Sequence, residues 1–414
     1  MLYTLLLDVR SRVTGSIADW LGISARRRLI LVCVWLLAII ASLPFVFRWH
    51  APPPAAGIGA SMRTGIGYVL TLALCGALYM VEFRRLGRRQ ALVLVFLILL
   101  LTKIYNRVHQ YTVDYGPNAF GTITNTAWQN MVQDHVIERK QFDPAHAARF
   151  LPNSVVRWLQ MGDWSFPQAR DLYRLLFGML LFYAIYRYAR LFSDHTGAVI
   201  AVLLVAVIAP ISFQHYVGQL TDPMSHLSFV LAFMFIERED FPFLFTTLVI
   251  GAVAKESVLV MAGYYVLFGR RDKRYPIRVG ALLACCAAVY LGVRMLLLHG
   301  PMAYKNISGV TIQHLKPNLS DSRWPYVFVL TAGALVPILA LGWTKIPISL
   351  RRLAVYLTPV LFVSSAFFSW LAETRNFMPV VIVDAVAAGY LLTRRAATAQ
   401  GGNSALAEQA LPNP

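Results

Sequence analysis

Hydrophobic runs separated by short charged clusters dominate the pattern of the chain. Three of the longest, residues 29–47, 91–101 and 281–298, approach or reach the roughly 20 residues that a helix needs to cross a hydrocarbon core. Lipid offers the backbone no hydrogen bonds, so such runs form helices rather than open sheet. The pattern therefore predicts an all-α polytopic membrane protein with about 11–13 transmembrane helices.

The runs divide the chain into regions. We expect an amphipathic cytoplasmic segment at 1–28, two N-terminal spans within 29–90, a main membrane domain at 91–395, and a disordered cytoplasmic tail at 396–414. The predicted spans lie at about 29–47, 65–81, 91–106, 172–190, 196–213, 224–237, 279–298, 326–343, 353–370 and 377–393.

Charge sets the orientation of these spans. The formal charge of +18 could suggest a nucleic-acid partner, but the 38 Lys and Arg residues stand in short clusters between apolar runs. With these spans, 22 of them fall on the side that holds both termini, 13 on the other side, and three within spans. The excess of positive charge marks the cytoplasmic side. We expect an integral membrane protein with both termini in the cytoplasm.

A hydrophobic stretch at 241–269 is too short for two full spans, which need roughly 40 residues, and longer than one. Two half-helices that turn back at Lys255-Glu256 keep the charged clusters on either side in the cytoplasm. One long tilted helix with a charged pair at its centre is the alternative.

Residues 107–171 form the one long hydrophilic loop of the predicted topology, and it faces outward. Apolar positions at helical spacing predict helices over 120–140 and 145–161, the second introduced by Asp143-Pro144 as N-cap and first helical residue. We expect a small helical subdomain on the membrane surface.

Six charged residues from distant segments should meet on this outer side, where ionisable groups near lipid are usually retained for a function. They are Asp114, Asp222, Lys255, Glu256, Glu373 and Arg375. Structural alternatives exist for most of them. Asp222 could belong to an N-cap before Pro223, Lys255 and Glu256 could pair with each other, Glu373 and Arg375 could reach the headgroups, and Asp114 could be an ordinary loop residue.

The order of short motifs resembles the bacterial polyprenyl-phosphate-dependent glycosyltransferases of the C-type (GT-C) membrane fold. The resemblance covers about 91–393 and depends on Arg149-x-Leu151-Pro152, Thr221-Asp222-Pro223, Ala254-Lys255-Glu256-Ser257 and Glu373-Thr374-Arg375-x-Phe377-x-Pro379. Many members carry two adjacent carboxylates in the first outer loop, whereas here Asp114 is followed by Tyr115 and Gly116.

The resemblance implies transfer of a sugar from a lipid-linked donor to an envelope glycan, lipid or protein at the outer face of a bacterial inner membrane. Asp114 would accept the proton of the acceptor hydroxyl, with Asp134, Glu138 or Asp143 in reserve. Arg375 and Lys255 would bind the donor phosphate, and Glu256, Glu373 and Asp222 would orient these cations or hold sugar hydroxyls.

Cofactors and other functions stay open at this point. A divalent metal is compatible with this chemistry, but neither the histidines of the loop nor the four cysteines, all in apolar runs, have metal-ligand spacing. Two other functions fit a polytopic protein: a transporter or lipid flippase, and a non-catalytic membrane protein that has kept a GT-C-like fold.

Overall fold

A computed structural model describes residues 61–117, 123–138, 149–162, 164–213, 220–298 and 312–409. In these ranges every regular element is a helix, and the backbone adds one isolated bridge between Pro117 and Thr124. The N-terminal segment and first span predicted at 1–47, the Asp143-Pro144 cap and the last five residues of the predicted tail lie outside the described residues.

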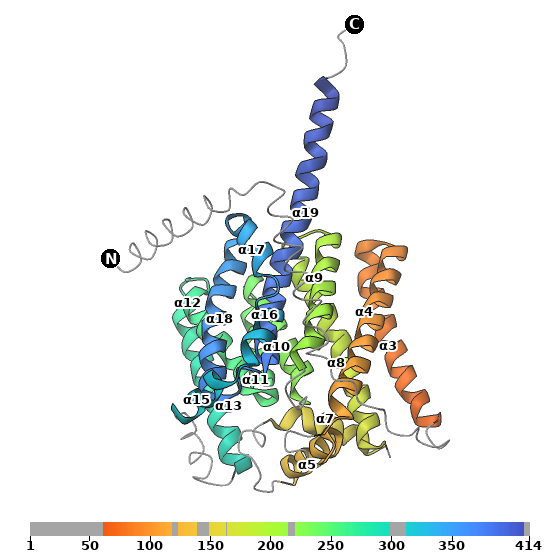
Figure 1. Ribbon diagram of the computed structural model, residues 1–414, viewed down its shortest axis with the longest axis vertical. Helices are drawn as coiled ribbons and strands as arrows, with labels where there is room; N and C mark the ends of the chain where they lie inside the picture. The colour runs from red at the N-terminus through yellow and green to blue at the C-terminus, as the bar shows by residue number, and fades with distance from the viewer. Residues whose placement is uncertain are drawn as a thin grey trace.

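The helices stand side by side as a bundle (Figure 1). Their bounds are α3 Ser61–Leu86, α4 Arg88–His109, α5 Asn125–Ile137, α7 Phe150–Gln160, α8 Phe166–Ala189, α9 His195–Ile208, α10 Thr221–Glu237, α11 Phe241–Ala254, α12 Val260–Phe268, α13 Tyr275–Leu298, α15 Ile312–Ser320, α16 Trp324–Leu330, α17 Val336–Gly342, α18 Ile348–Phe368 and α19 Met378–Gln409. Short irregular helices join them: η2 Gln110–Asp114, η3 Ala209–Phe213, η4 Glu256–Leu259, η6 Trp343–Lys345 and η7 Thr374–Phe377.

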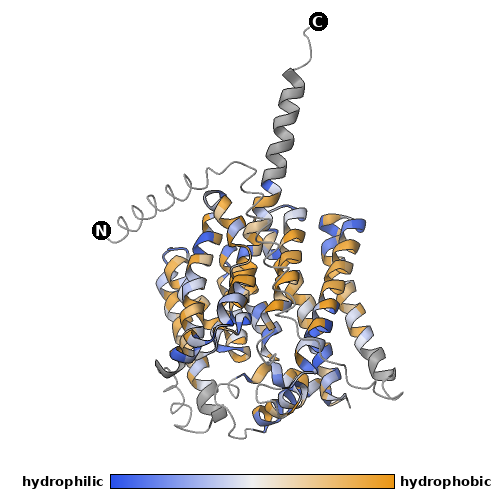
Figure 2. Cartoon of the chain, viewed as in Figure 1, coloured by the Kyte–Doolittle hydropathy of each residue, from blue (hydrophilic) through white to orange (hydrophobic). Residues whose placement is uncertain are grey.

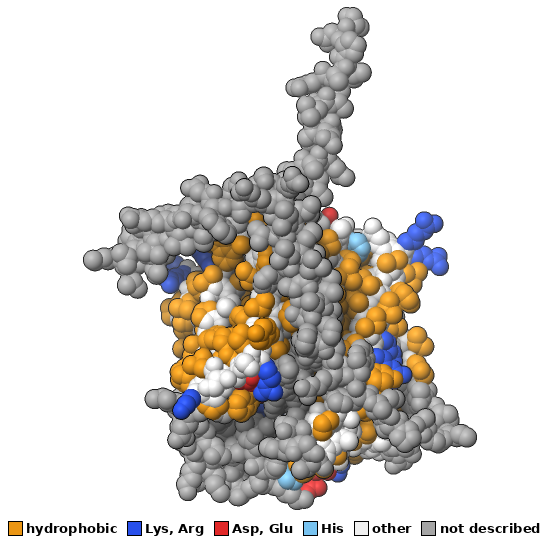
Figure 3. All heavy atoms as spheres, viewed as in Figure 1, with side chains coloured by type: hydrophobic (Ala, Val, Ile, Leu, Met, Phe, Trp, Pro, Cys, Tyr) orange, Lys and Arg blue, Asp and Glu red, His pale blue; other side chains and the backbone are white. Residues whose placement is uncertain are grey.

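Five helical segments in the described part of the chain are long and apolar enough to cross a membrane, which supports the prediction of an integral membrane protein. They are Arg88–Asp114, His195–Phe213, Tyr275–Gly292, Ile348–Phe367 and Thr374–Arg394. Hydrophobic residues run along the middle of the bundle, whereas hydrophilic residues gather at its ends and on α5 and α7 (Figure 2). Hydrophobic side chains also cover much of the lateral surface that Figure 3 exposes.

Among the described helices, α9 and α19 pack with their backbones in close contact. A Cβ on Gly389 would lie 2.3 Å from the carbonyl oxygen of Gly197, so only glycine lets the two backbones approach this far. Ala198, Ala201 and Ala385 are fully buried near the same contact. Small residues drive helix association in lipid because they allow extended van der Waals contact.

Two predicted segments are broken helices. Lys255 interrupts the 241–269 segment with an extended backbone (φ −162°, ψ 122°), and α11 and α12 flank it, so the half-helix prediction is confirmed and the single long helix is wrong. The segment predicted as one span at 326–343 is instead α16 and α17, separated by a turn around Gly333. Pro337, in the first turn of α17, has no backbone N–H to continue a helix from α16.

We call the end of the bundle that carries α5 and α7 the loop end; it is the lower end in Figure 1. Asn318 on α15 fixes the chain there after α18. Its side chain donates to the carbonyl oxygens of Ala366 and Ser369, each at 2.9 Å, and accepts from the N–H of Leu371 at 2.9 Å. This anchoring holds the short turn that leads into η7 and the site.

Candidate functional site

Asp114 ends a helix rather than opening a loop. The sequence predicted the third span to stop near residue 106, but α4 continues to His109 and then passes through the π-helical turn η2. This turn keeps the backbone hydrogen-bonded while it directs Asp114 inward. The side chain of Asp114 is completely buried. Single π-turns of this kind are frequent at functional sites.

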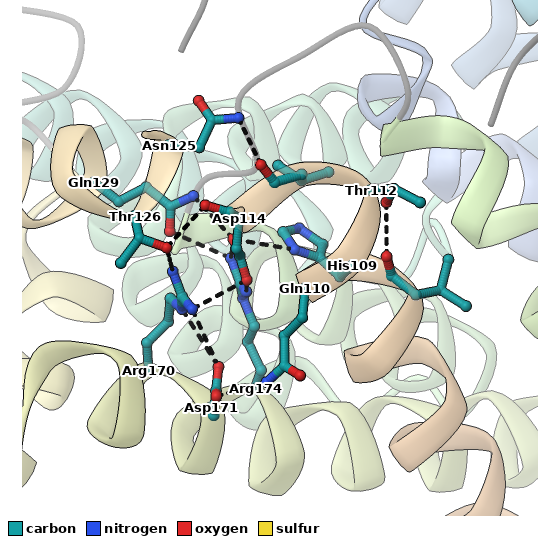
Figure 4. A network of polar contacts seen from close by, with 12 residues as sticks. His109, Gln110, Thr112, Asp114, Asn125, Thr126, Gln129, Arg170, Asp171 and Arg174 are labelled. Atoms are coloured by element: carbon teal, nitrogen blue, oxygen red, sulfur yellow. Dashed lines mark hydrogen bonds and ion pairs between the residues drawn. The ribbon is translucent and has the colours of Figure 1, made fainter. Parts of the chain in front are cut away.

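Two arginines of α8 surround the Asp114 carboxylate (Figure 4). Arg174 Nη1 lies 2.5 Å from Asp114 Oδ2, and Arg170 Nη2 lies 3.1 Å from the same oxygen. The other oxygen, Oδ1, accepts from Arg174 Nη2 and from Gln129 Nε2, each at 3.3 Å, and lies 3.4 Å from His109 Nδ1. We call these five side chains the Asp114 network.

The loop helix α5 is held to the same place through its first turn. Asn125 donates to the carbonyl oxygen of Val113 at 2.9 Å, and Thr126 donates to that of Asp114 at 3.0 Å. Thr126 also accepts from Arg170 at 2.9 Å. The Asp114 network therefore joins three elements, α4, α5 and α8, around one carboxylate.

A second carboxylate extends this network toward the surface. Asp171 lies 3.4 Å from Arg170 and accepts a 2.6 Å hydrogen bond from Gln110 Nε2. Gln110 in turn accepts from Arg107 at 3.2 Å. The sequence placed residues 170 and 171 in the loop. They lie instead in the first turns of α8, which begins at Phe166 behind a capping box of Ser165 and Gln168.

Four of the six predicted residues meet in a second buried cluster, the Arg375 network. Arg375 Nη1 donates to both oxygens of Asp222, at 2.9 and 2.7 Å, and its Nη2 donates to Glu373 at 3.0 Å. Lys255 Nζ lies 3.7 Å from Asp222 and donates to Asn376 at 2.9 Å. All four charged side chains are 8% exposed or less.

This arrangement decides between the structural alternatives. Asp222 pairs with Arg375 instead of capping α10, which has no side-chain cap. The buried side chains of Glu373 and Arg375 do not reach toward headgroups. Lys255 and Glu256 pair with different partners rather than with each other.

Glu256 lies beside the Arg375 network and pairs with Arg149. Arg149 Nη2 is 3.1 Å from Glu256 Oε1, and Arg149 Nε donates to Oε2 at 3.4 Å, so the guanidinium holds both oxygens. The pair connects the residue before loop helix α7 to the break in the hairpin. Glu256 is 29% exposed, which makes it the most accessible of the six predicted residues for which the structure gives an ion pair.

A small recess lies between the two networks. Its lining includes Gln129 of the Asp114 network, Arg149, and Thr221, which precedes Asp222, together with Trp128 and Asn153. The enclosed volume is about 20 Å³, enough for about one water molecule. This recess is too small for a sugar ring.

The cationic half of the Asp114 network was not predicted from the sequence pattern. Arg174 carried a signal, because an arginine within a predicted span needs a partner. Gln129 lay within the helix predicted over 120–140 and Arg170 near the end of the predicted loop, and nothing in the pattern marked either side chain as buried. Of the reserve bases, Asp134 is on the surface, 3.7 Å from Arg157, and Glu138 follows the last residue of α5.

Within the described ranges no three His, Cys, Asp or Glu side chains are grouped to hold a metal ion.

Both networks combine residues that are distant in sequence, with matched acids and bases. Each carboxylate of the six predicted residues faces at least one guanidinium or ammonium group. Their charges nearly cancel, as burial requires.

Comparison with protein-family models, with curated proteins and with solved structures gave no match for this chain.

Proposed function

We propose that this protein is a membrane glycosyltransferase that moves a sugar from a polyprenyl-phosphate donor to an acceptor at the outer face of a bacterial inner membrane. The observation that carries the proposal is the Arg375 network, in which Asp222, Lys255, Glu373 and Arg375 converge from three distant segments directly beside Glu256. The loop end faces outward in this proposal, because the topology predicted from the sequence assigns most of the Lys and Arg residues outside the spans to the opposite side.

The proposed reaction forms a bond between an acceptor oxygen and the anomeric carbon of the sugar. The bond from that carbon to the lipid phosphate breaks, and its electron pair leaves with the phosphate. The proton of the acceptor hydroxyl passes to a carboxylate. The site must therefore supply one accessible carboxylate and fixed positive charge for the leaving phosphate.

We assign the proton acceptor to Glu256. Both carboxylates have both oxygens bound, but the side chain of Glu256 is 29% exposed, whereas that of Asp114 is fully buried. A proton on Glu256 would weaken only its partly exposed pair with Arg149, whereas a proton on Asp114 would disrupt a fully buried pair. Asp114 then acts as a positioning residue that fixes α5 over the site, and Lys255 and Arg375 supply the positive charge.

Transfer from defined donors tests the proposal. The purified full chain in liposomes would receive radiolabelled polyprenyl-phosphate hexose or pentose, with membranes of the expressing cells as acceptor source. We expect label to move into the acceptor fraction and polyprenyl phosphate to be released. Glu256→Gln should lower the rate about 10²- to 10⁴-fold, the usual contribution of a positioned acid or base.

The matched control is Glu239→Gln. Glu239 also pairs with an arginine, Arg270, but lies in the turn between α10 and α11 and is 48% exposed. This variant should keep the wild-type rate. A rate that survives Glu256→Gln and disappears in Asp114→Asn, with both proteins stably folded, would return the proton acceptor to Asp114.

Two observations favour a second candidate, a non-catalytic membrane protein with an inherited fold. Asp114, Asp222, Glu256 and Glu373 are all paired with cations, and the recess between the networks has room for about one water molecule. Absence of transfer from every donor, in a protein that inserts and folds, would favour this candidate.

A further inference from the structure

A groove at the loop end between α3, α4 and α8 lies outside the Arg375 network and meets the extension of the Asp114 network at Gln110 and Asp171. It is an open groove with a volume of about 290 Å³, lined on the α4 side by Lys103, Asn106 and Arg107, and on the α8 side by Asp171. Trp164 borders it, with its ring 3.2 Å from the place where a Cβ on Gly67 of α3 would lie. The volume approaches that of a small-molecule site.

Two cations of this groove have no carboxylate partner among the described residues. Lys103 lies over the ring of Tyr68, 5.9 Å from its centroid, and Arg107 donates to the amide of Gln110. The two side chains are four residues apart and so point to the same face of α4. The one carboxylate of the lining, Asp171, is already balanced by Arg170. The groove therefore presents uncompensated positive charge.

Asn106 adds an unpartnered polar atom in the same groove. The residue is 7% exposed, and its Oδ1 is buried without a hydrogen-bond partner in the described structure. A buried acceptor left unpaired costs about 1–3 kcal/mol, so it indicates that a donor belongs there. The groove thus combines cations for an anion with one acceptor for a hydroxyl or ammonium group.

The helices that form the groove expose apolar side chains along the same part of the bundle. Leu72 of α3 is 66% exposed, and Phe96, Leu100 and Ile104 of α4 are 66%, 43% and 50% exposed. Such side chains are suited to contact lipid tails. Cations at the end of an apolar stretch of this kind lie at headgroup depth, where phosphates of anionic lipids are found.

We propose that this groove binds the phosphate of a membrane lipid, with Lys103 and Arg107 as its ligands. Asn106 accepts a hydrogen bond from a hydroxyl or ammonium group of the same headgroup, and the acyl or prenyl chain lies along α3 and α4. The inference does not depend on sugar transfer. Arg107 also donates a hydrogen bond to Gln110, which is linked through Asp171 and Arg170 to Asp114. A lipid phosphate bound to Arg107 would therefore change this chain of hydrogen bonds and ion pairs.

Native mass spectrometry of the detergent-solubilised full chain tests the groove. The probe is dioleoyl phosphatidic acid, and dioleoylglycerol is the matched lipid without phosphate. We expect the phosphatidic acid to bind far more tightly than the glyceride. Each cation should contribute about fivefold, so Lys103→Gln/Arg107→Gln should weaken binding about 25-fold.

The control double variant Arg157→Gln/Lys316→Gln removes the same charge from exposed positions on α7 and α15, at the loop end but outside the groove. It should bind like the wild type. Equal losses in both double variants, or equal binding of the two lipids, would overturn the proposal. Complete competition by inorganic phosphate would also overturn it, because the groove would then be a soluble-anion site. If the double variant does not fold, Lys103→Gln alone must still give its fivefold loss.

Discussion

The Asp114 network allows a sharp test because removal of one carboxylate leaves two buried arginines. Arg174 and Arg170 approach the same Asp114 oxygen at 2.5 and 3.1 Å, and these side chains are 2% and 1% exposed. At an effective dielectric constant of about 20, a pair of unit charges roughly 4 Å apart interacts by about 4 kcal/mol. Breaking a buried pair from one side typically costs about 3–5 kcal/mol.

We therefore expect Asp114→Asn to lower the free energy of unfolding by about 3–5 kcal/mol. The measurement is SDS titration in mixed micelles, followed by the loss of helical circular dichroism. Arg174→Met should be similarly unstable. The double variant should be more stable than the sum of the two losses predicts, by about 1–3 kcal/mol, because it removes both members of one pair.

The control is an exposed ion pair at the same end of the bundle. Asp134 and Arg157 are 3.7 Å apart, with side chains 36% and 48% exposed. Asp134→Asn should change the stability by less than about 1 kcal/mol, as for most surface pairs. If Asp114→Asn were as mild as this control, the carboxylate would not be the buried centre described above. A stable Asp114→Asn protein without transfer activity would instead favour its role as the proton acceptor.

Three further predictions concern other parts of the fold. Gly389→Ala should lower the melting temperature, because the added Cβ would lie 2.3 Å from a backbone oxygen of α9. The control is Gly280→Ala, whose added Cβ would have no atom within 4 Å; this variant should have an unchanged or slightly higher melting temperature. Equal melting temperatures would refute the close approach. Asp222→Asn should lower the free energy of unfolding by about 3–5 kcal/mol in the SDS titration, because it removes one of the two carboxylates that pair with Arg375. A loss below about 1 kcal/mol would contradict the burial of Asp222 in the Arg375 network. Asn318→Ala should cost about 1–3 kcal/mol through the backbone groups it leaves unsatisfied, and a stability equal to wild type would show that water replaces the side chain.

Several features of the fold could be predicted from the sequence because they depend on local patterns. The length and hydrophobicity of the runs predicted helices, and five of them are long enough to span a membrane. The length of 241–269, together with the charged clusters at its ends, predicted two half-helices with a break at Lys255. Membrane insertion makes these features local, because every backbone polar group in lipid must be satisfied within its own helix.

Local patterns failed where the chain leaves regular geometry. The π-helical turn η2 extends α4 as far as Asp114, and no residue type is a reliable predictor of such a turn. The break between α16 and α17 was also missed, although Gly333 and Pro337 stand close together there. The hydrophobic run continues through both residues, so the prediction treated the whole segment as one span and did not allow for the effect of glycine and proline on the backbone.

The sequence by itself predicted an all-α membrane protein. It also predicted that Asp222, Lys255, Glu373 and Arg375 lie on the same side of the membrane, because every second connection between consecutive spans is on that side. Only the tertiary structure decided how the charges pair: Asp114 with Arg174 and Arg170, Asp222 with Arg375, and Glu256 with Arg149. Topology restricts a residue to one end of the bundle, whereas an ion pair requires two side chains within about 4 Å. That distance depends on how α8, α10 and the hairpin pack, which their separate sequences do not encode.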